Sequence, residues 1–159
     1  MLGAHGGTAV SSVTYPVSPA HARGTLDVGD AHGIYWEVRG HPDGRPVVVL
    51  HGGPGSGATA SWTQWFDPAA YRVVLFDQRG CARSTPNAAD TVDALNANTT
   101  QHLIADIEAL RMHLAIDRWL VMGASWGSVL GLAYAQAHPG SVSELVLFSV
   151  VGGSAREVE

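Results

Sequence analysis

The sequence is poor in cysteine, in charged residues and in long apolar runs, and each shortage excludes a class of protein. Cys81 is the single cysteine among 159 residues, so an internal disulfide framework is excluded and a reducing compartment is indicated. Charged residues make up 14% of the chain and the net charge is −5, which leaves no basic footprint for nucleic acid. No run approaches the roughly 18 apolar residues of a membrane helix, and the N-terminus lacks the features of a signal peptide. These shortages predict a soluble, cytoplasmic protein without nucleic-acid or membrane partners.

The rest of the composition is that of a well-packed globular domain. Hydrophobic residues account for 46% of the chain, and its length is sufficient to bury a sizeable core. Residues 1–22 carry Gly, Ser, Ala and Pro without periodicity, which predicts a loose leader. Residues 23–159 show no repeat, low-complexity tract or internal boundary, so they are predicted to form one folded unit.

Short apolar runs predict the strands of a sheet. Residues 25–28 and 34–38 are separated by glycine-containing turn residues, which predicts a hairpin. Four later runs lack polar alternation, as is typical of strands covered on both faces of a parallel sheet: residues 47–50, 73–76, 119–122 and 145–151.

Two helices are predicted among these strands. Residues 98–114 have apolar side chains along one face, with Asn98 as a candidate cap and Asp106 and Glu108 on the face predicted to be solvated. Residues 128–137 are apolar nearly all round, which predicts a buried helix. A hairpin followed by alternating strands and helices indicates an α/β fold, with a mostly parallel sheet and helices on both faces.

Residues 123–127, G-A-S-W-G, connect a predicted parallel strand to the apolar helix and have the G-x-S-x-G pattern of a nucleophile elbow. A serine on such a tight turn needs small residues two positions away on each side. The N-terminus of the following helix favours negative charge beside its hydroxyl. The pattern alone is weak, but the strand before it and the helix after it single out Ser125 as the candidate nucleophile.

A second loop, H-G-G-P-G at 51–55, also follows a predicted parallel strand and would meet Ser125 at the same edge of the sheet. A glycine-rich turn can point a backbone N–H into a site without a side chain in the way. The N–H groups of Gly53 and Trp126 would then form an oxyanion hole. His51 is expected to order this loop by hydrogen bonding.

A third loop, D-Q-R-G-C-A-R-S at 77–84, ends another parallel strand. Asp77 and Arg79 would brace this loop through charge-assisted bonds, or the segment is an ordinary structural turn. Cys81 has no basic group aligned to activate it and is predicted to be buried and unreactive.

Together these motifs resemble the proline iminopeptidases, or prolyl aminopeptidases, which are serine peptidases of the α/β-hydrolase fold. The matching segments cover most of residues 25–150 in the family's order: L-D-V-G-D at 26–30, Y-W-E-V at 35–38, P-D-G-R-P-V-V-V-L-H-G-G-P-G at 42–55, Y-R-V-V-L-F-D-Q-R-G-C at 71–81, R-S-T-P at 83–86, S-W-G-S at 125–128 and L-A-Y-A-Q-A-H-P at 132–139. Ala82 and Ala124 depart from the family pattern, which usually has glycine at the first position and often at the second. Ala82 matters only if that position needs a positive φ.

The resemblance implies an activity and a set of site residues. It implies an aminopeptidase that releases N-terminal proline from short peptides through an acyl-enzyme on Ser125, with no metal or organic cofactor. It implies Gly53 and Trp126 as the oxyanion donors. The loop residues that it implies as support are His51, Gly52, Pro54, Gly55, Asp77 and Arg79.

The residues that would activate Ser125 are not evident in the sequence. In this fold an acid and then a histidine follow the serine, and the histidine present after it, His138, should lie a helix length away. The resemblance places the acid, the base and a helical cap beyond Glu159. Residues 23–159 are therefore expected to be the N-terminal part of an α/β-hydrolase domain, truncated after the strand that follows the nucleophile helix, and to turn over substrate poorly alone.

Two alternatives remain. Gly53 and Gly55 after a strand, with Asp77 at the end of the next strand, imitate a dinucleotide-binding fingerprint. Pro54 removes a backbone donor where phosphate would be held, and residues 56–66 lack a long helical period. The other alternative keeps the fold with different substrates, as in an esterase or an epoxide hydrolase. The histidines show no metal-binding spacing.

Overall fold

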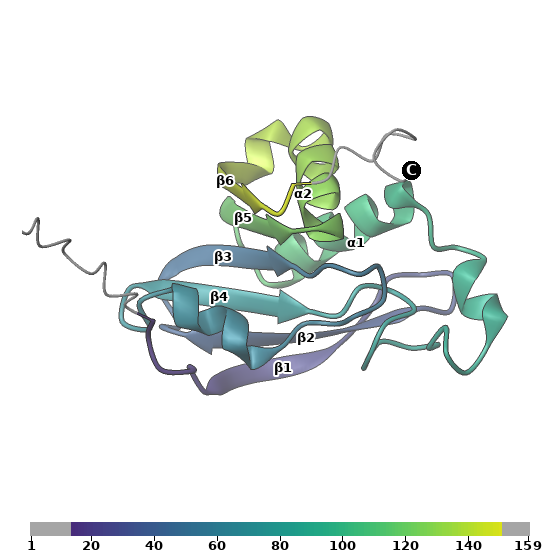
Figure 1. The fold of residues 1–159 in the computed structure, drawn as a ribbon, viewed down its shortest axis with the longest axis horizontal. Helices are drawn as coiled ribbons and strands as arrows, with labels where there is room; N and C mark the ends of the chain where they lie inside the picture. The colour runs from purple at the N-terminus through teal and green to yellow at the C-terminus, as the bar shows by residue number, and fades with distance from the viewer. Residues whose placement is uncertain (1–13, 151–159) are drawn as a thin grey trace, which may run out of the picture.

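A computed structural model describes residues 14–150, which form one six-stranded sheet. The strands lie in the order β1-β2-β4-β3-β5-β6 (Figure 1). The last four of these pair in parallel, while β1 and β2 pair antiparallel and join the sheet through β4. Their bounds are Ala20–Asp27 for β1, Gly33–Gly40 for β2, Arg45–Leu50 for β3, Tyr71–Phe76 for β4, Trp119–Ala124 for β5 and Val142–Phe148 for β6. The predicted hairpin and mostly parallel sheet are confirmed.

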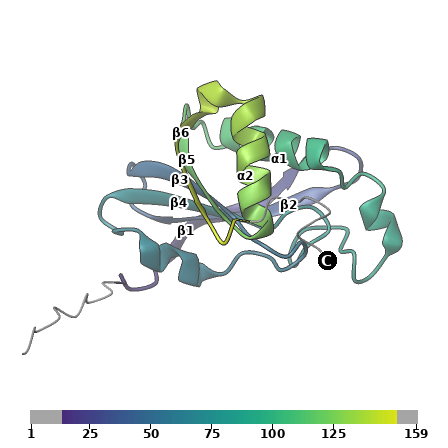
Figure 2. The same cartoon turned by 45° about the horizontal axis from the view of Figure 1, so that its top comes forward.

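Helices lie on both faces of the sheet. The α-helices α1 (Thr100–His113) and α2 (Trp126–Ala137) pack together on one face (Figure 2). The other face is covered in part by η1 (Ala60–Trp65), a short 3-10 helix; two more 3-10 helices are η2 (Val92–Leu95) and η3 (Pro139–Ser141). No helix in residues 14–150 has the length and apolar character to cross a bilayer.

The central strands divide their side chains between two apolar layers. Val48, Val74 and Val121 point toward the layer under the α-helices, and their neighbours Val47 and Val73 point toward the layer under η1. All five are at most 1% exposed. This double burial is why these strands read as unbroken apolar runs rather than as alternating ones.

The leader predicted over residues 1–22 overlaps β1, because this strand begins at Ala20. The N–H of Tyr15 donates to the carbonyl of Gln64, and the N–H of Ser18 donates to Thr63 Oγ1, so this segment is tied to η1. The rest of the predicted leader, residues 1–13, lies outside the described residues. At the other end, the predicted last strand is β6, which is placed three residues earlier; residue 151 lies outside the described part of the chain.

Two helix predictions need correction. Thr99, not Asn98, caps α1, because the Thr99 side chain accepts from the N–H of His102. The Asn98 side chain instead donates to the carbonyl of Arg79, a loop contact that no helix pattern reveals. The helix predicted to be buried all round is α2, but Leu132 is 46% exposed, because only one side of α2 packs against the sheet and α1.

Candidate active site

Ser125 lies between the last residue of β5 and the first residue of α2, at the carboxyl end of the parallel strands. Its backbone has φ 52° and ψ −122°, a conformation that residues other than glycine rarely adopt. Its N–H donates to the carbonyl of Phe148 at 3.2 Å, and its carbonyl accepts from both the N–H and the hydroxyl of Ser128. The turn is therefore held on both sides while the Ser125 side chain stays exposed.

The two glycines of the G-x-S-x-G pattern are required by close backbone contacts. A Cβ on Gly127 would lie 2.8 Å from the carbonyl carbon of Leu50 and closer still to its oxygen. A Cβ on Gly123 would lie 2.6 Å from the carbonyl carbon of Gly127. The start of α2 thus packs directly on the ends of β3 and β5, which leaves no room for a side chain at either position.

The loop at 51–55 passes beside the serine. A Cβ on Gly52 would lie 3.3 Å from Ser125 Cβ and 3.9 Å from Ser125 Oγ. Gly53 and Gly55 have φ values of +119° and +99°, which only glycine adopts readily. Within residues 14–150, neither the N–H of Gly53 nor that of Trp126 has a protein acceptor, so both are available to a ligand.

His51 is buried and both of its ring nitrogens are occupied. Nε2 accepts from the N–H of Gln78 at 3.0 Å, so the proton is on Nδ1, which donates to the carbonyl of Gly52 at 2.9 Å. Burial lowers the pKa of His51 below its ordinary value, so the ring is neutral near pH 7. An imidazole used in this way orders the loop and cannot take a proton from Ser125.

Gln78 is a site residue that the sequence analysis did not single out. It is 2% exposed, and its side-chain amide contacts two separate segments. Nε2 donates to the carbonyl of His51 at 2.9 Å, and Oε1 accepts from Trp126 Nε1–H at 3.1 Å. The sequence does place Gln78 between the charged residues Asp77 and Arg79. A neutral amide in a turn, however, has no pattern that marks it as a site residue.

Asp77 is fully buried and receives bonds from Ala58 and Arg83. Its Oδ1 accepts from the N–H of Ala58 at 2.7 Å, and its Oδ2 accepts from Arg83 Nε at 2.6 Å and from the Arg83 N–H. Burial pushes the pKa of Asp77 upward, but the bonds from Arg83 and Ala58 outweigh it and leave the pKa below its ordinary value. The carboxylate therefore stays ionised and joins the segment after the loop at 51–55 to the loop at 77–84.

Arg79 is also buried, and the prediction for its partner, Asp106, is wrong. Asp106 was predicted on the solvated face of α1, yet it is 1% exposed and accepts from Arg79 Nε at 2.7 Å and Nη2 at 2.6 Å. Arg79 also donates to the carbonyl of Ala97, and the bonds to Asp106 raise the pKa of Arg79. Amphipathic periodicity cannot distinguish an exposed carboxylate from one paired beneath a loop.

Glu108 of α1 was also predicted to be solvated, but its side chain lies between α1 and α2. Its carboxylate accepts from the hydroxyl of Tyr134 at 2.7 Å and from both Nε and Nη2 of Arg111. The bonds from Arg111 lower the pKa of Glu108 to about 2, despite partial burial. Burial, followed by the bond to Glu108, raises the pKa of Tyr134 well above its ordinary value. This polar contact ties the two α-helices together.

The candidate base after the serine does not reach it. His138 caps the far end of α2, which at 12 residues is about 18 Å long. Its ring packs on Tyr134 with a centroid distance of 5.3 Å. Within the part of the chain that the structure describes, no histidine nitrogen bonds Ser125 Oγ, and no three His, Cys, Asp or Glu side chains are grouped to hold a metal.

A pocket of about 470 Å³ lies beside the serine turn. Pro54 from the loop at 51–55, Gln78 and Arg79 from the loop at 77–84, and Trp126 at the start of α2 line it. The rest of the lining comes from the start of α1 and the segment before it: Leu95, Asn98, Thr99, Thr100, Gln101 and Leu103. Cys81 also lines it but is only 7% exposed, and burial raises the pKa of its thiol. The predicted burial of Cys81 is confirmed, and the raised pKa keeps it protonated near pH 7.

The chain has named relatives of greater length. It is 58% identical over 144 residues to a probable proline iminopeptidase of Streptomyces coelicolor, covering 91% of this chain and 45% of that protein. It is 55% identical over 132 residues to a proline iminopeptidase of Arabidopsis thaliana, covering 83% of this chain and 33% of that protein. The chain thus spans less than half the length of these curated relatives. The resemblance seen in the motifs is confirmed.

Solved structures show the same likeness. A proline iminopeptidase from Mycobacterium smegmatis superposes with a TM-score of 0.65 at 31% identity, covering 78% of this chain and 42% of that one. A proline iminopeptidase-related protein from Thermus thermophilus gives a TM-score of 0.67 at 28% identity, covering 79% and 43%. The family model described as alpha/beta hydrolase fold matches residues 45–156, from the start of β3 past the end of β6. Since that match includes the serine turn and both neighbouring loops, the chain belongs to the alpha/beta hydrolase fold family.

Proposed function

We propose that this chain supplies the nucleophile and the oxyanion hole of a serine aminopeptidase that releases N-terminal proline from short peptides. The observation that carries the proposal is the strained turn at Ser125, with Gly52 packed against its side chain and the free N–H groups of Gly53 and Trp126 on either side. The proline specificity is taken from the named relatives in Streptomyces and Arabidopsis.

In this mechanism Ser125 Oγ attacks the carbonyl carbon of the N-terminal residue and loses its proton to a base. The tetrahedral oxyanion accepts from the N–H groups of Gly53 and Trp126, and the dipole of α2 adds to this stabilisation. Collapse breaks the peptide bond, and the leaving amine takes up a proton as the shortened peptide departs. Water then hydrolyses the ester on Ser125 and releases the free amino acid.

The base and its orienting acid are proposed to come from outside these 159 residues. His51 has both nitrogens occupied and His138 is at the far end of α2. Without an imidazole partner the serine hydroxyl is a poor nucleophile, so the 159-residue chain alone is expected to turn over substrate poorly.

The test uses a hybrid protein, in which this chain is joined to the part of the Streptomyces coelicolor relative that lies outside the match. The hybrid is expected to cleave proline-arylamide, and Ser125→Ala should reduce kcat by at least about 10⁴-fold because the nucleophile is lost. Ser143→Ala, which truncates an exposed serine on β6, is the matched control and should leave kcat unchanged.

Two further arms separate the alternatives. A chelator should leave the hybrid's activity unchanged, and inhibition by it would contradict the serine mechanism. Acetyl and other simple aryl esters test the esterase alternative, because an ester carbonyl would fit the same two N–H donors. Faster turnover of those esters than of proline-arylamide would replace the aminopeptidase proposal with an esterase, and activity that survives Ser125→Ala would refute both.

A further inference from the structure

The geometry points to Gln78 as a positioning residue: its side-chain amide sets the distance between the two segments that carry the oxyanion donors. This inference rests on the proposed function, because it concerns the N–H groups of Gly53 and Trp126. Gln78 lines the pocket, but its described hydrogen bonds go to His51 and Trp126 and not to Ser125, and it exchanges no proton or bond in the proposed mechanism.

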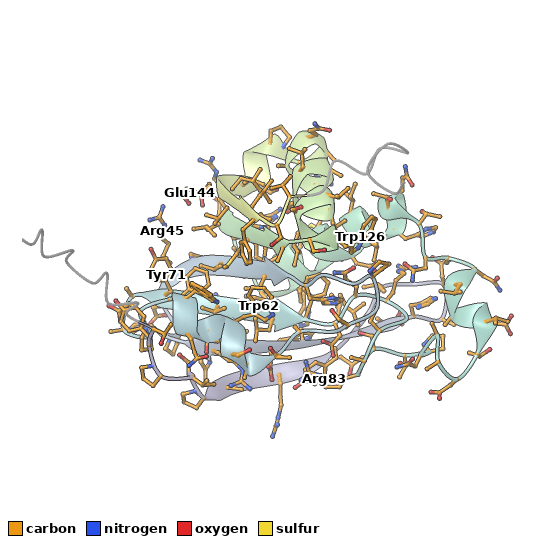
Figure 3. The ribbon with its side chains drawn as sticks, in the orientation of Figure 1. Arg45, Trp62, Tyr71, Arg83, Trp126 and Glu144 are labelled. Carbon is orange, nitrogen blue, oxygen red and sulfur yellow. The ribbon has the colours of Figure 1, made fainter. Side chains whose placement is uncertain are left out.

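The sheet order explains why one side chain can do this. The strands β4, β3 and β5 are neighbours in that order, and Gln78, His51 and Trp126 follow their respective carboxyl ends. Gln78 reaches across the end of the central strand to the strand beyond it. Figure 3 shows Trp126 at this end of the sheet, beside the start of α1.

Three hydrogen bonds make the connection. The Gln78 N–H donates to His51 Nε2 at 3.0 Å, and the Gln78 Nε2–H donates to the His51 carbonyl at 2.9 Å. The third is from Trp126 Nε1–H to Gln78 Oε1 at 3.1 Å. His51 in turn donates to the carbonyl of Gly52, so the connection continues into the loop to the residue before Gly53.

The amide has only one workable orientation. The indole N–H of Trp126 can only donate and the carbonyl of His51 can only accept, so Oε1 must face the first and Nε2 the second. Gln78 and His51 are 2% and 1% exposed, so a group that lost its partner here would have little access to water in its place. This bridge, formed by the Gln78 amide between His51 and Trp126, is therefore rigid as well as short.

Rigidity at this place bears on catalysis because the two oxyanion donors belong to different segments. Gly53 follows β3 and Trp126 begins α2, and within residues 14–150 no backbone hydrogen bond is described between the loop at 51–55 and residues 125–127. A displacement of about 1 Å in a catalytic group can cost about 100-fold in rate. The inference is that loss of the Gln78 amide loosens this spacing and lowers transition-state stabilisation more than substrate binding.

The first test is spectroscopic and uses the 159-residue chain. Gln78→Met keeps the length of the side chain and removes its hydrogen bonds, and Gln136→Met on the exposed side of α2 is the matched control. The indole N–H resonance of Trp126, assigned by Trp126→Phe, should move upfield in Gln78→Met, and the backbone amide resonances of Gly53 and Trp126 should shift with it. An unmoved indole resonance would show that the bridge is absent in solution.

The second test is kinetic and uses the hybrid protein described above. Gln78→Met should lower kcat by about tenfold or more while KM stays within about twofold, because a looser oxyanion hole weakens transition-state binding. Gln78→Glu keeps the acceptor for the indole but, when ionised, has no donor for the His51 carbonyl. Its activity relative to Gln78→Met should rise as the pH falls, because the protonated carboxyl can donate again.

The outcomes separate this inference from the proposed function. If Ser125→Ala retains activity, the proposed function fails, and the resonances of Gly53 and Trp126 still decide whether Gln78 spaces the two segments. If Ser125→Ala is inactive but Gln78→Met keeps wild-type kcat, or raises KM and leaves kcat alone, only this inference is overturned. If Gln78→Met does not fold, Trp126→Phe, which removes the indole donor and keeps an aromatic ring and the backbone N–H, should produce the same selective fall in kcat.

Discussion

The two ends of the four parallel strands are built differently, although α2 spans the distance between them. At the carboxyl end the backbone is irregular: Ser125 and Gly53 have positive φ values, and Arg79 and Asp77 are buried with their partners. At the amino end, the ion pair between Arg45 and Glu144 is exposed (Figure 3). The charged side chains of Asp77, Arg79 and Asp106 at the carboxyl end are enclosed and bonded, whereas the Arg45–Glu144 pair at the amino end faces water.

The difference means that similar substitutions should have unequal costs at the two ends. Close packing and buried charge leave the carboxyl end little freedom to adjust. At the exposed Arg45–Glu144 pair, water can replace a lost contact. Two matched pairs of substitutions test this contrast, and a third comparison tests a backbone feature that the two ends share.

The largest effect is expected from Gly127→Ala, with Gly140→Ala as its counterpart at the amino end. A Cβ at Gly127 meets the backbone of Leu50, which cannot rotate aside, whereas a Cβ at Gly140 meets nothing within 4 Å. Overpacking against movable side chains costs about 1–3 kcal/mol, and we expect Gly127→Ala to exceed this and Gly140→Ala to stay within about 0.5 kcal/mol. Urea unfolding followed by circular dichroism measures both. Equal urea midpoints for the two variants would contradict the expected difference in packing between the two ends of the strands.

The second comparison uses one ion pair from each end. Asp106→Asn leaves the buried guanidinium of Arg79 with only Asp30, 3.6 Å away and 54% exposed, as a charged partner, and we expect it to lower the free energy of unfolding by about 3 kcal/mol. Glu144→Gln removes an exposed partner of Arg45, whose side chain is 51% exposed, and should cost at most about 1 kcal/mol. Repeating both measurements in high salt sharpens the test, because only the small effect at Glu144 should fade. A loss of less than 1 kcal/mol for Asp106→Asn would contradict the expected cost of the buried charge.

The smallest effect concerns alanines with a positive φ. Ala82 at the carboxyl end has φ 44°, so the departure from the glycine seen in the resembling family does carry backbone strain. Ala115, which follows α1 toward the amino end, has φ 51°. Ala82→Gly and Ala115→Gly should each stabilise the fold by about 1 kcal/mol, while Ala105→Gly, on the exposed side of α1, should destabilise it by a similar amount. Thermal unfolding of the three variants checks the signs, and a lower Tm for Ala82→Gly would show that its backbone is unstrained.

Much of the fold could be predicted because its signals are local. The apolar runs at β3, β4 and β5 need no partner to be recognised, since burial on both faces removes polar residues from the strand itself. The glycines around Ser125 are equally local, because the turn and the contact with the neighbouring strands exclude a side chain at those positions.

Other features depend on partners far along the chain and could not be read from a pattern. Asp106 lies at the edge of the apolar face of α1, where its charge suggests a surface position, and it is buried because Arg79, 27 residues earlier, lies against it. Gln78 bonds Trp126, 48 residues later, only because the strand order brings three strand ends together. Periodicity reports which way a side chain faces on its own element, and it contains nothing about what another element places there.

The sequence by itself therefore determined the strands, the serine turn and the loop glycines of this protein, because each follows from local backbone geometry and from the apolar surface that a strand or helix must bury. Only the tertiary structure decided which polar groups are enclosed at the site, that His51 has no nitrogen free for Ser125, and that Gln78 joins the two loops. Those outcomes depend on the order of the strands in the sheet, and distances between residues remote in the chain are set only when the sheet has formed.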